Sequence, residues 1–108
     1  SQDNSTNVTV DQTLSAPTSI TAVRIGLSAV RINWSDNNLA EEGYIIERRT
    51  GQGSFAQQIF TTRDAATAVD SVGLAVNSTY GYRLRAIRYF ERGEYSPVAT
   101  INLALPFP

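Results

Sequence analysis

Apolar and polar residues alternate in several short stretches of the chain. The alternation is clearest where polar residues separate Val30, Ile32 and Trp34, and again along residues 80–86. A period of two predicts a β-strand with one face in a core and the other in water. No stretch has helical periodicity, so we predict an all-β fold with further short strands at residues 20–23, 44–47, 55–61, 67–71 and 98–103.

Residues that favour turns separate these stretches, at positions 26–29, 36–38, 41–43, 51–54 and 91–94. Several short strands joined by such turns indicate an antiparallel sandwich or barrel. The apolar positions are expected to form its core, where large aromatic side chains supply much of the buried area. The core residues predicted from the alternation are Trp34, Tyr44, Ile46, Tyr80, Tyr82 and Leu84.

The composition excludes several classes of function. The 108 residues include neither cysteine nor histidine, so zinc, copper and haem sites lack their usual ligands and a catalytic triad cannot be assembled. The formal net charge of −1 gives no long-range attraction for nucleic acid. No apolar run approaches the roughly 20 residues that cross a bilayer. We therefore expect no catalytic residue, cofactor or metal, no nucleic-acid partner and no membrane insertion.

Four segments, taken in order, resemble the fibronectin type III family. Residues 30–34 are similar to its second strand, which ends in a core tryptophan, and residues 34–37 followed by 42–48 are similar to the stretch that leads from this tryptophan to its third strand. Residues 73–86 (GLAVNSTYGYRLRA) are similar to its tyrosine-corner segment, and residues 95–100 (YSPVAT) to the entry of its last strand. The similarity is strongest to bacterial extracellular members attached to carbohydrate-active enzymes and surface proteins.

The resemblance implies an immunoglobulin-like antiparallel β-sandwich of seven strands, with sheets A-B-E and C-C′-F-G. The domain would occupy residues 16–104. A polar linker or loose N-terminal strand would precede it at residues 1–15, and an exit linker would follow at residues 105–108.

The resemblance also implies roles for individual residues. Leu74 would cap one end of the core, and the Tyr80 hydroxyl would bond to a backbone group a few residues upstream, as in a tyrosine corner. Loss of the Tyr82 hydroxyl is expected to cost less than loss of the Tyr80 hydroxyl. Phe55 and Ile59 are one residue further apart than the usual pair, which predicts a bulge in the short fourth strand.

The expected F-G hairpin carries the candidate ligand contacts, Tyr89, Phe90 and Arg92. Exposed aromatic rings there could stack on sugars or on a protein partner. Residues 92–94 (Arg-Gly-Glu) are similar to the Arg-Gly-Asp that some animal family members present to integrins, with a longer acid. The favoured interpretation of this segment is a polar turn with Gly93 at positive φ.

Carboxylates are close together in the expected B-C loop, at Asp36, Glu41 and Glu42. Such residues would suit a glycosidase acid–base pair or a calcium site, but the favoured interpretation is a solvated loop. Asn-X-Ser/Thr sequons occur at Asn4, Asn7, Asn33 and Asn77, and they matter only if the source glycosylates.

Together these features predict a non-catalytic extracellular module, a spacer or adhesion domain of a larger secreted or surface protein. Its partners would be neighbouring domains of the same chain and, as alternatives, a polysaccharide or a surface protein bound through the F-G loop. A further alternative is a surface-fibre subunit that donates residues 6–11 as a strand to a neighbour. Because that segment is polar, we expect a monomer.

Overall fold

The computed structural model describes residues 14–38 and 41–105, which form strands, turns and loops. Its strands are β1 (Thr18–Gly26), β2 (Ala29–Ser35), β3 (Gly43–Thr50), β4 (Ala56–Phe60), β5 (Thr67–Asp70), β6 (Thr79–Arg88), β7 (Glu91–Arg92) and β8 (Ala99–Asn102). Within the described residues, no helix is long and apolar enough to cross a membrane. The prediction of an all-β fold is confirmed.

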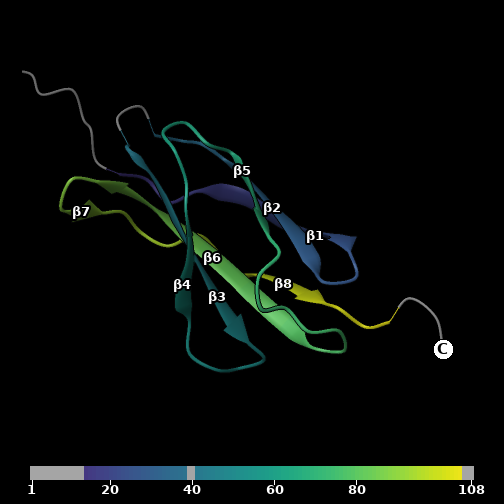
Figure 1. The fold of residues 1–108 in the computed structure, drawn as a ribbon. Coiled ribbons are helices and arrows are strands. Elements are labelled where there is room, and N and C mark those ends of the chain that lie inside the picture. Colours follow the sequence, from purple (N-terminus) through teal and green to yellow (C-terminus); the bar gives the residue numbers. More distant parts are fainter. Residues whose placement is uncertain (1–13, 39–40, 106–108) are drawn as a thin grey trace, which may run out of the picture.

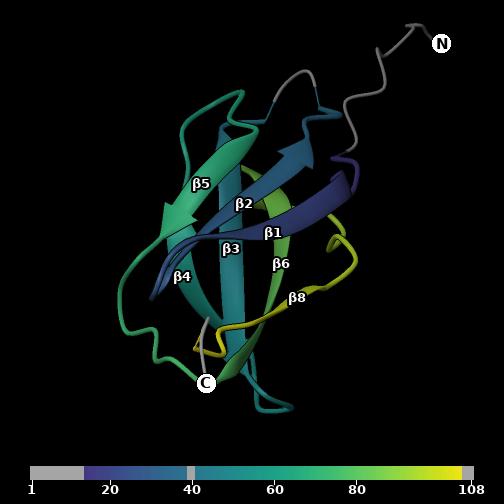
Figure 2. The same cartoon turned by 90° about the vertical axis from the view of Figure 1, so that its right-hand side faces the viewer.

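Two antiparallel sheets pack face to face as a sandwich (Figures 1 and 2). One sheet has the order β1-β2-β5, and the other has the order β4-β3-β6-β7, with β8 also paired to β6. In the letters of the expected fold these are A-B-E and C′-C-F-G, so the sheet arrangement is confirmed. The structure has one strand more than expected because strand G is divided into β7 and β8, which pair with opposite ends of β6.

The core forms where the alternating strands turn their apolar side chains inward. In β2, for example, Val30, Ile32 and Trp34 are buried while Arg31 between them is exposed. The ring of Trp34 meets that of Tyr44 edge to face across the two sheets, with 5.5 Å between centroids, a contact worth about 0.5–1.5 kcal/mol beyond its buried area. All the core residues predicted from alternation are buried: Trp34, Tyr44, Ile46, Tyr80, Tyr82 and Leu84.

Strand β4 contains the predicted bulge. Along its pairing with β3, Ile46 lies opposite Ile59 but Glu47 lies opposite Gln57, so Gln58 is an extra residue. An extra residue bends the strand and reverses the side of the sheet on which the next side chain points. Ile59 consequently packs against the core, whereas Phe55 lies against Arg83 on the outer face of the sheet.

The folded body begins earlier than the expected boundary at residue 16. Leu14 is 7% exposed and belongs to the core, and the Ser15 amide donates a hydrogen bond to Asn38 Oδ1 over 2.6 Å. The last two residues of the segment expected as a polar linker or loose N-terminal strand, residues 1–15, therefore contact the sandwich. Residues 1–13, including the alternating segment and the sequons at Asn4 and Asn7, lie outside the described residues.

Candidate functional site

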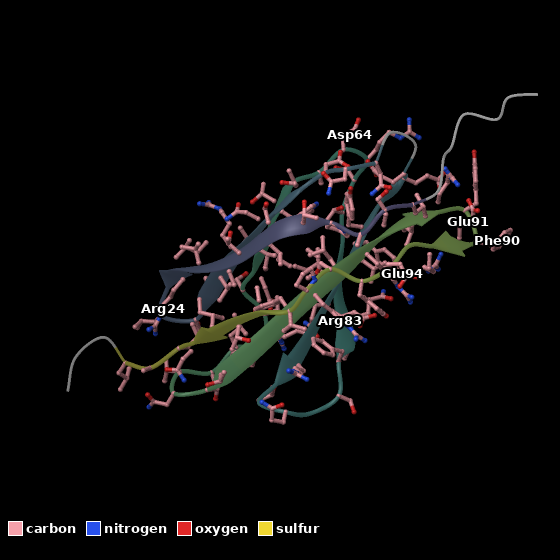
Figure 3. The ribbon with its side chains drawn as sticks, turned by 180° about the vertical axis from the view of Figure 1, so that it is seen from behind. Arg24, Asp64, Arg83, Phe90, Glu91 and Glu94 are labelled. Carbon is pink, nitrogen blue, oxygen red and sulfur yellow. The ribbon has the colours of Figure 1, made fainter. Side chains whose placement is uncertain are left out.

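The candidate ligand contacts lie at the turn of the β6–β7 hairpin. Tyr89 and Phe90 are 77% and 99% exposed, and Phe90 projects from the end of the molecule (Figure 3). Glu42 holds the turn in place, because its Oε1 accepts a hydrogen bond from the Tyr89 amide over 2.8 Å. The two rings thus stand free on an anchored backbone, although Tyr89 has a φ of 53°, which is uncommon for a bulky residue.

The segment Arg92-Gly93-Glu94 does not form the turn, contrary to expectation. The turn is made by Tyr89 and Phe90, and Gly93 is not among the described glycines with positive φ. Glycine is required at 93 for a different reason, since an added Cβ would come within 2.9 Å of the Leu14 Cβ. The Arg92 guanidinium donates to the carbonyl oxygens of Tyr89 and Glu91, so it braces the hairpin at the edge of the exposed rings.

Tyr95 lies on the outer face of the second sheet. The Arg83 guanidinium carbon lies 3.8 Å from the Tyr95 ring centroid and 4.1 Å from the Phe55 centroid, and Arg83 also pairs with Glu47 at 2.8 Å. The Tyr95 hydroxyl donates to Glu47 Oε2 over 2.8 Å, and partial burial together with this acceptor raises its pKa. Tyr95 is therefore engaged within the domain, which leaves Tyr89 and Phe90 as the free aromatics of this end.

The tyrosine corner forms at the opposite end of the sandwich. The Tyr80 hydroxyl accepts a hydrogen bond from the Ala75 amide over 2.8 Å, which is the contact that the resemblance implies. Leu74, next to it, is half-buried and packs against the core. The sequon residue Asn77 lies in the same loop with a φ of 63°, and its Oδ1 accepts the Leu105 amide. The sequon residue Asn33 lies on β2 and bonds to Thr67 of β5.

A buried ion pair near this corner was not predicted from the sequence. Asp70 of β5 is 2% exposed, and its Oδ2 accepts hydrogen bonds from Arg48 over 2.8 Å and from the Tyr82 hydroxyl over 2.7 Å. Arg48 and Tyr82 belong to the other sheet, so the network joins the two layers of the sandwich. Burial is the main reason that the pKa of Tyr82 is raised, and the bond to Asp70 adds to it. The alternation does place Arg48 on the inward face after Tyr44 and Ile46, and that was the available signal.

A second buried carboxylate lies at the hairpin end. Glu41, in the β2–β3 loop, is 1% exposed, so the interpretation of this loop as solvated is wrong for Glu41. Asp36 of the same loop and Asp64 of the β4–β5 loop each place a carboxylate oxygen within 4.8 Å of one from Glu41 and of each other. Glu42, one residue away, instead contacts the hairpin. Sequence reasoning missed Asp64 because it lies 23 residues from Glu41.

Burial dominates the electrostatics of this cluster. It raises the pKa of Glu41, and the neighbouring carboxylates of Asp36 and Asp64 act in the same direction against the hydrogen bond from the Asp64 amide. Burial also raises the pKa of Tyr44, whose hydroxyl donates to Asp36 Oδ1. The cluster does not suit glycoside hydrolysis, because that reaction needs both carboxylates at the sugar and Glu41 is closed off from solvent.

The comparisons with known proteins bear on the fold. No family model matches the sequence, and no curated protein matches it. Solved structures are nevertheless similar in shape, among them a Fn3-like protein from Clostridium thermocellum with 17% identity and a TM-score of 0.65, covering 78% of this chain and 86% of that one. The FN3 domain of human collagen XX has 19% identity and a TM-score of 0.68, covering 90% and 98%.

A third similar structure is an enzyme. The β-1,2-glucanase from Parabacteroides distasonis has 16% identity and a TM-score of 0.72, over 88% of this chain but only 13% of the enzyme. Structural matches with sequence identities this low show the fold of the chain and do not show its function. Two sheets with A-B-E and C′-C-F-G pairing, a tyrosine corner and these structural matches lead to one conclusion: the chain has the fold of a fibronectin type III domain.

Proposed function

We propose that this chain is a non-catalytic extracellular module that acts as a spacer or adhesion domain within a larger secreted or surface protein. The position of the two ends of the folded body carries the proposal. Leu14 lies against Gly93 beside the β6–β7 hairpin, whereas Leu105 is bonded to Asn77 at the opposite end. Figure 1 shows the purple start near β7 and the yellow end beyond β8. Sequences attached at the two ends would therefore be held apart by the length of the sandwich.

The similar structures support a place in a larger chain. The glucanase match covers a small part of that enzyme, so a domain of this shape does occur within a carbohydrate-active protein. Absence of histidine and cysteine from the sequence and the closed position of Glu41 favour a non-catalytic role. An extracellular location rests on the resemblance of the sequence to bacterial extracellular members of the family and is part of the proposal.

Spin labels can test the spacer function, because the chain has no cysteine of its own. Cysteines at Ser15 and Ala104 would carry the labels, and pulsed electron resonance would measure their separation. With β6 spanning ten residues, the body is about 33 Å long at about 3.3 Å per residue. We expect one narrow distance distribution of this order that is unchanged when folded domains are fused to both ends. The control pair, Ser15 and Glu94, lies at one end and should give a short distance. A broad distribution for the long pair would contradict the spacer function.

Exposure of Tyr89 and Phe90 favours a second function, binding of a polysaccharide or a surface protein through the hairpin. Glycan-array and pull-down measurements on the wild type and on the double variant Tyr89→Ser, Phe90→Ser would test it. Since both rings are exposed, the double change should alter stability by no more than about 0.5 kcal/mol. Saturable binding that the folded double variant has lost would favour the binding module over the passive spacer.

The proposed module is a monomer. Light scattering on the full chain and on a chain that lacks residues 1–13 should give the same monomeric mass. The truncation should stop before Leu14, because that residue belongs to the core. An oligomer that becomes monomeric on truncation would instead indicate strand donation by the N-terminal segment.

A further inference from the structure

Three loop carboxylates converge at the hairpin end of the sandwich without a described cation beside them. Asp36 follows β2, Glu41 precedes β3, and Asp64 lies between β4 and β5. One oxygen from each lies within 4.8 Å of the others. The ion pairs among the described residues are formed by Asp70, Glu47 and Glu91, so none of them neutralises this cluster.

The Glu41 side chain is the observation that points to a ligand. It is 1% exposed, and one of its oxygens, Oε1, accepts the Asp64 amide over 2.9 Å. The other oxygen, Oε2, is buried and has no hydrogen-bond partner among the described residues. A buried carboxylate is normally paired or coordinated to a metal, because leaving it without a partner is costly. A proton or a cation would complete this oxygen, which is closed off from water.

The chemistry of the donors selects the kind of ligand. All three side chains offer carboxylate oxygens, which hard divalent cations prefer. Calcium binds oxygens at about 2.3–2.6 Å. An ion placed centrally among oxygens no more than 4.8 Å apart lies at most about 2.8 Å from each, so side-chain movements of a few tenths of an ångström let it bind all three. Calcium also accepts six to eight oxygens in irregular geometry, whereas magnesium demands a near-octahedral shell. Three carboxylates from two loops, completed by water, suit calcium better.

We propose that Asp36, Glu41 and Asp64 bind a calcium ion that fastens the two loops where the chain passes between the sheets. The β2–β3 loop leads from the first sheet to the second, and the β4–β5 loop leads back. An ion shared between them joins both crossings at one point. This revises the expectation of no metal, under which calcium was an alternative at these carboxylates and a solvated loop was the favoured interpretation.

The bound ion would also stiffen the entry of the chain. Asp36 Oδ1 accepts the Asn38 amide, and the Asn38 side chain bonds to both the amide and the carbonyl of Ser15. A fixed Asp36 therefore holds Asn38, and Asn38 holds the backbone at Ser15, near the start of the described residues. Calcium at this site should reduce the mobility of Ser15 while leaving Leu105, at the other end, unchanged.

Calorimetric titration with calcium chloride tests the proposal on protein first dialysed against chelator. We expect one saturable site with a dissociation constant of about 10⁻⁴–10⁻³ M, the range of extracellular calcium modules, and a melting temperature that rises with calcium. Magnesium chloride at the same concentration should bind at least about tenfold more weakly. Absence of saturable calcium binding by the folded wild type would overturn the proposal.

Matched variants locate the ion. Glu41→Gln and Asp64→Asn keep the side-chain shape and remove one charge each, and each should weaken calcium binding by at least about tenfold. Asp64 is exposed, so its variant should fold even if Glu41→Gln does not. The control is Glu94→Gln, which removes an exposed acid at the same end of the molecule (Figure 3) and should bind like the wild type. Wild-type affinity in both cluster variants would place any bound calcium elsewhere and overturn the assignment.

Discussion

At each end of the sandwich, a tyrosine of the second sheet donates its hydroxyl to an aspartate, which lies in the first sheet at one end and in the loop that leaves it at the other. Tyr82 donates to Asp70 at the corner end, and Tyr44 donates to Asp36 at the hairpin end. The two ends differ in what accompanies the aspartate. Asp70 also forms an ion pair with Arg48, whereas Asp36 lies close to two further carboxylates, those of Glu41 and Asp64.

The difference separates a structural network from a candidate binding site. At the corner end the buried negative charge is matched by a guanidinium, and both Asp70 oxygens have hydrogen-bond partners. At the hairpin end negative charge accumulates, and a buried oxygen of Glu41 is left without a partner. A protein tolerates the second arrangement when a proton or a cation completes it. A buried acid thus stabilises the contact between the two sheets at one end of the fold, whereas the buried acid at the other end is available to bind a cation.

Removal of the cation at the corner end should have the largest effect. Arg48→Met keeps the length of the side chain but leaves Asp70 buried without its counter-charge, which costs about 3–5 kcal/mol. Denaturant unfolding would measure the loss. The control is Arg88→Met, whose partner Glu91 has a side chain that is 62% exposed, so its loss should stay below about 1 kcal/mol. Similar losses at both arginines would mean that the Arg48 pair is not effectively buried.

Loss of the tyrosine hydroxyl at the same end should have the next largest effect. Tyr82→Phe removes a hydrogen bond to a charged, buried acceptor and should cost about 1.5–3 kcal/mol. Tyr80→Phe removes a hydroxyl that accepts one backbone amide and should cost about 0.5–1.5 kcal/mol. This order reverses the one expected from the resemblance, because Asp70 was not recognised as the acceptor. Unfolding curves in which Tyr80→Phe is the more destabilising change would restore the earlier order.

Substitution of Glu41 by glutamine at the hairpin end should change the stability of the fold less than the substitutions above, and it should raise the stability where they lower it. Because burial raises the pKa of Glu41 above 4.5, the folded state holds the Glu41 proton more tightly than the unfolded chain. In chelator, this contribution to stability is therefore fully present below pH 4.5 and is lost as the pH rises through the raised pKa. Glu41→Gln cannot ionise, so at neutral pH without calcium it should be slightly more stable than the wild type.

Thermal unfolding at several pH values, in chelator and in calcium, would measure this change. Calcium should stabilise the wild type more than Glu41→Gln, because the variant binds the ion more weakly, and this narrows or reverses the difference in stability between them. If Glu41→Gln destabilised the protein in chelator at neutral pH, Glu41 would be a structural acid like Asp70, and the contrast between the two ends would disappear.

The sequence by itself determined the sandwich and most of its core. Period-two alternation identified Val30, Ile32 and Trp34 as one buried face, because a strand has only two faces and one of them must leave water. The bulge in β4 was predicted from the family resemblance, because Phe55 and Ile59 are one residue further apart than the usual pair. Chain-local patterns of this kind need no knowledge of what lies opposite.

Only the tertiary structure decided which polar residues meet across the two sheets and between the loops. Arg48 and Asp70 lie in different sheets, 22 residues apart, and Asp64 reaches Glu41 from a different loop. Leu14 entered the core from a polar stretch because Gly93, far along the chain, leaves room for it. These features depend on which distant segments become neighbours: the pairing of charges, the burial of an acid and the docking of a terminal residue. The alternation along one segment does not indicate which segment of the other sheet will lie opposite it.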